Sequence, residues 1–84
     1  MIVSFRDKET ETVFLTGRSV RYKMIESVAF RKLRFLDAAI SLRDLGHVPG
    51  NHLEALKRDR KGQHSIRISG QWRICFVWRD GNAY

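Results

Sequence analysis

The C-terminal third of this 84-residue chain concentrates side chains that bind phosphate. Residues 57–84 carry a net charge of +5, in a chain whose formal net charge is +7. The cations of this third are Lys57, Arg58, Arg60, Lys61, Arg67, Arg73 and Arg79. Arg outnumbers Lys by 11 to 5 in the whole chain, and a guanidinium can hold a phosphate through two parallel hydrogen bonds. The pattern favours a polyanionic partner such as RNA over a neutral small molecule.

Cleavage of RNA without a metal needs three groups. One takes the proton of the 2′-hydroxyl, one stabilises the crowded negative phosphate, and one protonates the leaving oxygen. Arg and Lys suit the second task, and Glu54 and His64 are candidates for proton transfer. The sequence therefore predicts a cationic RNA site. A solvated basic face without any ligand is the simpler alternative.

The remaining reactive residue types point to no cofactor. His47, His52 and the single Cys75 lack the spacing of a metal site, so we expect neither a metal nor another cofactor. One cysteine cannot form an internal disulfide, and nothing argues for an oxidising compartment. The longest apolar run, Ile74 to Trp78, is too short to span a membrane. We expect a cytoplasmic protein without a membrane partner.

The length predicts one domain over residues 1–84, and the apolar spacing predicts its helices. Asp7 as N-cap and Gly17 as C-terminal stop bound a helix over residues 8–16. Apolar residues form a helical stripe from Ile25 to Ile40. Ser41 is then the cap of a short further turn. The loop over residues 46–51 contains Pro and Gly.

Strand patterns occur at the start of the chain and after residue 52. Residues 2–5 read as a short opening strand, and residues 59–62 as a type I turn. Alternation predicts a strand at residues 65–69 and another at 71–79. The second should bury Trp72, Ile74, Phe76 and Trp78, and we expect Cys75 to be a core residue too.

Asp80-Gly81 is a strong signal for a two-residue hairpin turn, yet three residues follow it. Such a short return leaves most of the strand at residues 71–79 with an unpaired edge. We therefore expect a domain that is shortened at its C-terminus, or one that borrows a strand from a partner.

Several segments of the sequence are similar to a known family. Residues 53–62 (LEALKRDRKG), 65–68 (SIRI) and 71–76 (QWRICF) resemble the HigB branch of the RelE toxin superfamily, also called plasmid-maintenance killer proteins. The opening IVSF and the LDAA at residues 36–39 fit as well. The resemblance covers nearly the whole chain. It implies an α+β fold with two N-terminal helices packed on a small antiparallel sheet, here without the last strand.

The resemblance also implies a function. Such proteins are toxins of type II toxin–antitoxin pairs that enter the ribosomal A site and cut translated mRNA. A HigA-like helix-turn-helix antitoxin neutralises the toxin, and the complex binds its own operator DNA. By position, Lys57 and Arg60 match residues that contact the RNA phosphates, and Arg73 matches the Arg that stabilises the transition state. Glu54 sits where some relatives carry a His.

The other polar residues of the basic third are expected RNA contacts rather than catalysts. They are Arg58, Lys61, His64, Arg67 and Arg79. Family members usually continue past the position of Tyr84 with a strand that closes in Asp-Tyr-His and contributes to the active site. The alternative reading is therefore a catalytically impaired, shortened toxin homologue that binds RNA, the ribosome or an antitoxin.

Overall fold

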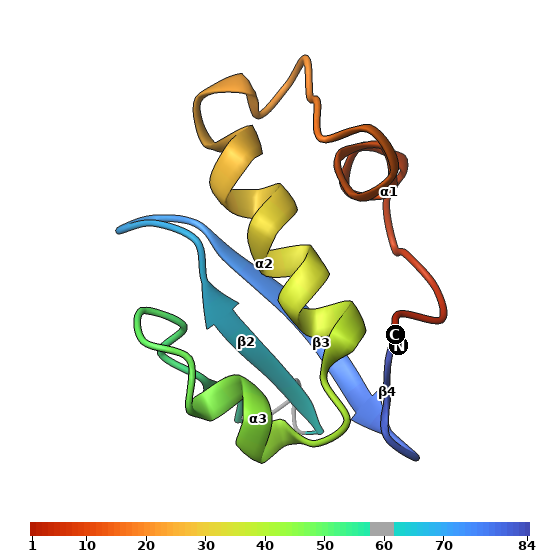
Figure 1. Cartoon of the computed structure of the whole chain (residues 1–84), viewed down its shortest axis with the longest axis vertical. Coiled ribbons are helices and arrows are strands. Elements are labelled where there is room, and N and C mark those ends of the chain that lie inside the picture. Colours follow the sequence, from red (N-terminus) through yellow and green to blue (C-terminus); the bar gives the residue numbers. More distant parts are fainter. Residues whose placement is uncertain (58–61) are drawn as a thin grey trace.

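The protein is a sheet with helices on one of its faces. A computed structural model describes residues 1–57 and 62–84. The helices are α1 (Lys8–Thr16), the 3-10 turn η1 (Lys23–Ile25), α2 (Glu26–Ala38) and α3 (Leu42–Gly46). The antiparallel strands β1 (Glu54–Ala55), β2 (Gln63–Arg67), β3 (Arg73–Arg79) and β4 (Asn82–Ala83) follow one another in the order β1-β2-β3-β4. Figure 1 shows α2 lying across β2 and β3, with α1 beside it. The predicted α+β class is confirmed.

The first helix has the predicted boundaries because its two caps act as expected. The Asp7 carboxylate accepts a hydrogen bond from the Thr10 N–H at 2.8 Å. Gly17 adopts a left-handed conformation with φ 74°, and its N–H donates to the Val13 carbonyl. Likewise, the Ser41 hydroxyl accepts from the Asp44 N–H at the start of α3.

The apolar stripe of α2 is shorter than predicted. Ala29, Leu33 and Leu36 are buried, but the helix ends at Ala38 and Ala39 is extended, with ψ 137°. Ile40, the predicted last member of the stripe, is 82% exposed. The prediction was wrong there because a new N-cap at Ser41 redirects the chain before another turn can form.

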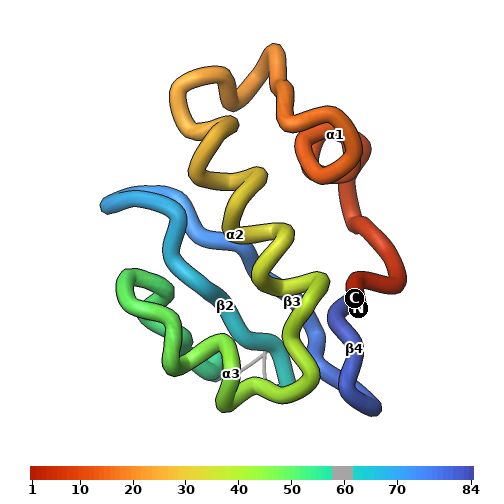
Figure 2. Tube along the Cα trace, in the orientation of Figure 1, coloured from red at the N-terminus to blue at the C-terminus, as the bar shows by residue number. Residues whose placement is uncertain are grey.

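The predicted hairpin at Asp80-Gly81 is confirmed. Both residues have positive φ, 54° and 78°, as a type I′ turn requires. The returning strand β4 is short, as expected, and pairs with Trp78 and Arg79. The predicted opening strand is reduced to a single parallel bridge between Ile2 and Ala83. Figure 2 shows the two ends of the chain side by side at this bridge.

The core lies between the helices and one face of the sheet. Ile66 and Phe76 pack with Leu36, Ala39 and Leu45, and a second cluster joins Val13 to Ala29 and Leu33. Two predictions for β3 were wrong. Cys75 is exposed, because it lies on the sheet face away from the helices. Trp72, expected in the core, is 42% exposed.

Candidate active site

A polar cavity of about 410 Å³ lies where β1, β2 and β3 meet on the helix-free side of the sheet. Its walls are His52, Glu54, Arg67, Ser69, Gly70, Gln71 and Arg73. The strand register explains this gathering. Arg67 is the partner of Arg73, and Glu54 is the partner of Ser65 two residues before Arg67, so these side chains share one face.

Arg73 is the best-fixed side chain of the cavity. Its Nε donates to the Ser65 hydroxyl at 2.7 Å, and its Nη2 donates to the carbonyls of Ser65 and His52. A Glu54 carboxylate oxygen lies 4.0 Å from the same Nη2. Within the described part of the chain, Nη1 makes no hydrogen bond. The guanidinium is therefore held on one side and keeps a donor pair for a ligand.

The loop that supplies the His52 carbonyl is fixed by Asn51, which is fully buried. The Asn51 side chain donates to the Leu45 carbonyl at 3.0 Å and accepts from the Lys32 ammonium. The Asn51 backbone carbonyl accepts from the Arg67 N–H at 2.6 Å. Asn51 thus joins α2, the end of α3 and β2, and it holds the neighbouring residue against Arg73.

Lys32 is 5% exposed, which is unusual for a lysine. Desolvation, and secondly the nearby Arg31, lower the pKa of its ammonium. Sequence reasoning missed both Lys32 and Asn51. The available signal was Lys32 itself, a charge three residues after Ala29 and four before Leu36 on the buried stripe of α2.

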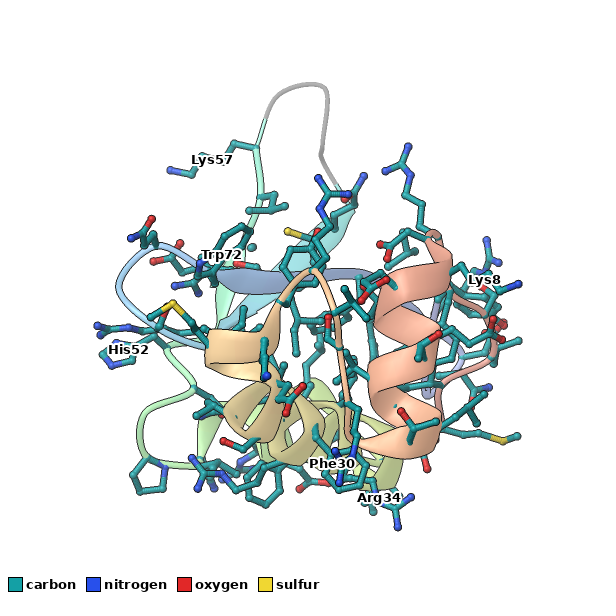
Figure 3. All side chains as sticks on the ribbon, turned by 90° about the horizontal axis from the view of Figure 1, so that it is seen from above. Lys8, Phe30, Arg34, His52, Lys57 and Trp72 are labelled. Atoms are coloured by element: carbon teal, nitrogen blue, oxygen red, sulfur yellow. The ribbon has the colours of Figure 1, made fainter. Side chains whose placement is uncertain are left out.

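The structure brings together some predicted site residues and separates others. Arg73, Glu54 and Arg67 line one cavity. Lys57 is exposed and does not line it, and Figure 3 shows its side chain pointing away from the sheet. Arg79 lies at the far end of β3, with its guanidinium 4.6 Å from the centre of the Tyr84 ring. Arg58, Arg60 and Lys61 lie outside the described residues, so their RNA contacts stay predictions.

His64 lies on the other face of the sheet from Arg73. Its ring stacks on Phe76 with centroids 6.1 Å apart. Its Nδ1 is buried and has no hydrogen-bond partner among the described residues. The structure therefore does not place His64 in the cavity. Also within the described residues, no group of three His, Cys, Asp or Glu could hold a metal ion, and no helix is long and apolar enough to cross a membrane.

The fold and the cavity together define a class of protein. A small basic α+β domain with a fixed Arg, a second Arg and a carboxylate in one polar cavity is suited to metal-free chemistry on a phosphodiester. The RelE-like toxins are a class of this kind.

Comparison with known proteins gives the family. The family model of the HigB-like toxins, described as the RelE-like toxin of type II toxin–antitoxin system HigB, matches residues 3–84. The chain is 41% identical over 85 residues to Toxin HigB-1 of Vibrio cholerae, covering 99% of this chain and 90% of the relative. It is 33% identical over 86 residues to Endoribonuclease HigB of Proteus vulgaris, covering 100% and 91%. The chain belongs to the HigB-like toxin family.

The linking role of Asn51 predicts a large loss of stability on its removal. Asn51→Ala leaves the Lys32 ammonium and the Leu45 carbonyl buried without their partner, and we expect a cost of about 3 kcal/mol in the free energy of unfolding. Urea denaturation measures it. Asn82→Ala is the matched control, because its 3.4 Å hydrogen bond is exposed, and it should cost at most about 0.5 kcal/mol. Equal stabilities for the two variants would refute the linking role.

Proposed function

We propose that this toxin cleaves mRNA on the ribosome and that the cavity around Arg73 is its catalytic site. Because the chain belongs to this family, it is the toxin of a type II toxin–antitoxin system. Its similarity to Endoribonuclease HigB supports endoribonuclease activity. The observation that carries the assignment of the site is the fixed Arg73 guanidinium, with Arg67 opposite it in the register and Glu54 at 4.0 Å.

The proposed reaction is attack of a ribose 2′-oxygen on the neighbouring phosphorus, with departure of the 5′-oxygen. Arg73 donates from Nη1 to a nonbridging phosphate oxygen, where negative charge grows in the transition state. Arg67 binds the same or the adjacent phosphate. Glu54 is 62% exposed and accepts the 2′ proton. Lys57 adds an exposed cation after β1, and the sequence predicts further RNA contacts at Arg58, Arg60 and Lys61, which lie outside the described residues.

The group that protonates the leaving 5′-oxygen is expected on an additional strand at the free edge of β3. On the side of β3 away from β2, no described residue pairs with the stretch from Arg73 to Phe76. A cavity of about 660 Å³ runs along this edge, lined by residues 72–77 on one side and by Ser4, Phe5 and Arg6 of the opening segment on the other. The resemblance implies a strand that closes in Asp-Tyr-His and contributes to the active site, and we propose that such a closing strand binds along the edge from Arg73 to Phe76.

The partners follow from the family and the resemblance. A toxin of a type II system has an antitoxin. We propose that this antitoxin is HigA-like with a helix-turn-helix domain, that operator DNA is bound through it, and that the toxin acts in the cytoplasm where translated mRNA is found. The alternative of an impaired binding module is not favoured by the relatives' names.

Arg73→Ala tests the catalytic site. Removal of the fixed guanidinium should lower the rate of mRNA cleavage on ribosomes about a hundredfold or more and relieve growth arrest on expression, while antitoxin binding stays intact. The matched control is Arg43→Ala, since Arg43 is an exposed Arg on α3. Unchanged arrest by Arg73→Ala would exclude the catalytic role.

Glu54→Gln tests the proposed base. Gln keeps the size and one acceptor oxygen but cannot take a proton, so we expect cleavage to fall about a hundredfold with unchanged stability. Steady-state cleavage on ribosomes measures it. Glu11→Gln, an exposed carboxylate on α1, serves as control and should cleave like the parent chain. If Glu54→Gln also cleaves like the parent, another group is the base.

Extension of the chain tests the closing strand. A chain continued after Tyr84 by a family-like strand ending in Asp-Tyr-His should cleave at least about tenfold faster than the 84-residue chain. The same extension ending in Ala-Phe-Ala restores strand pairing without the proton-transfer groups and serves as control. Equal rates for all three chains would show that the strand takes no part in catalysis.

A further inference from the structure

We infer that Trp72, supported by Tyr22 and the cations around it, binds an unpaired RNA base next to the cleaved phosphate. The inference rests on the proposed function, because it assigns a second contact to the same RNA. It names a residue that the sequence predicted to lie in the core and that the structure places at the surface.

Trp72 presents aromatic surface beside the catalytic cavity. It is 42% exposed, and it directly precedes Arg73. It contacts Tyr22 edge-on, with ring centroids 5.3 Å apart and an interplanar angle of 66°. The exposed part of Trp72 that remains beside this contact is where a base would stack. Figure 3 shows Trp72 on the same side of the molecule as His52, a wall of the cavity.

The support of Trp72 is rigidly built. Ser19 is 6% exposed and links the segment before η1 to two helices. Its hydroxyl donates to Glu9 of α1 and accepts from the Tyr22 N–H at 2.7 Å, and its N–H donates to Glu26 of α2 at 2.7 Å. The hydrogen bond from Ser19 also lowers the pKa of the Glu9 carboxyl, so this carboxylate is ionised at neutral pH. Tyr22 is therefore held in place against Trp72.

The same segment carries cations that suit a nucleic-acid backbone. Arg21 lies with its guanidinium carbon 5.4 Å from the centre of the Tyr22 ring, and Lys23 follows. Neither forms a salt bridge with a described residue. Proteins that bind single strands combine such cations with aromatic rings on which bases stack, largely without regard to sequence. Aromatic rings and cations together favour RNA over a protein partner, although Val20 and Met24 are also exposed here.

The positions of Trp72 and Arg73 fit a single RNA strand that crosses the sheet at the start of β3. Alternation along the strand turns Trp72 towards the helix side and Arg73 towards the cavity. Trp72 directly precedes Arg73, which lines the smaller cavity. A phosphate held by Arg73 therefore has an adjoining base within reach of Trp72. This stack would hold the reactive ribose and phosphate in line.

The test combines Trp72→Leu with removal of single bases from the mRNA. Cleavage is measured as kcat/KM on ribosomes programmed with a short mRNA that lacks one base at a time near the cut. We expect Trp72→Leu to lower kcat/KM at least about fivefold, and loss of one flanking base to lower it by a similar factor. Combining the two should cause little further loss, because both remove the same stack. Trp72→Tyr keeps a ring and should restore most of the activity.

Phe35→Leu is the matched control, because Phe35 is an aromatic of similar exposure, 38%, on α2. It should leave kcat/KM unchanged. If Trp72 has only a structural role, Trp72→Leu lowers kcat/KM by the same factor whichever base the mRNA lacks. That result overturns the inference. So does a Trp72→Leu variant that loses antitoxin binding but cleaves normally. A parent chain that cleaves no RNA would instead refute the proposed function itself.

Discussion

The hydrogen bond between the Lys32 ammonium and the Asn51 side chain is the contact on which the site depends. A charge removed from water is costly unless it is paired or hydrogen-bonded, and desolvation lowers the pKa of Lys32 accordingly. Asn51 compensates part of this cost and at the same time bonds to Leu45 and to the Arg67 N–H. The loop between α3 and β1 is thereby held in one position. Without it the His52 carbonyl would not meet Arg73, and the guanidinium would lose one of its fixed partners.

A second feature that shapes the structure is that most of the described hydrogen bonds of acidic side chains are made with backbone N–H groups. Asp7, Glu9, Glu26, Asp37 and Asp44 each accept a hydrogen bond from a backbone N–H, at helix starts and in the segments that link them. These carboxylates stabilise the fold through backbone hydrogen bonds, of which the one between Asp37 and Ile2 joins the end of α2 to the opening segment, and they do not form salt bridges with the cations of the described residues. Within residues 1–57 and 62–84, the salt bridge between side chains is that of Arg73 with Glu54, 4.0 Å apart inside the cavity. The exposed cations of the described residues are therefore available to a polyanion, while acidic side chains stabilise the fold.

The parts of the fold that could be predicted from the sequence are those determined by neighbouring residues in the chain, such as helix caps and tight turns. The boundaries of α1 follow from Asp7 and Gly17, and the hairpin follows from two residues that tolerate positive φ at Asp80-Gly81. Arg73 and Glu54 were proposed from residue type and family resemblance, and the register brings them to one cavity. Asn51 could not be found in this way, because its role arises from contacts with α2 and β2, which are distant in sequence. No local pattern encodes such contacts.

The failures at Trp72 and Cys75 have a common cause. Alternation tells which side chains share a face of a strand, but it does not tell whether another element covers that face. Ile74 and Phe76 are packed under α2, whereas Cys75 faces away from the helices and Trp72 lies just before β3, against Tyr22. Both uncovered positions adjoin Arg73. A site for a single RNA strand needs open surface around the group that acts on the phosphate. The positions where the core pattern fails, Trp72 and Cys75, therefore leave open surface near Arg73, where the proposed RNA would bind.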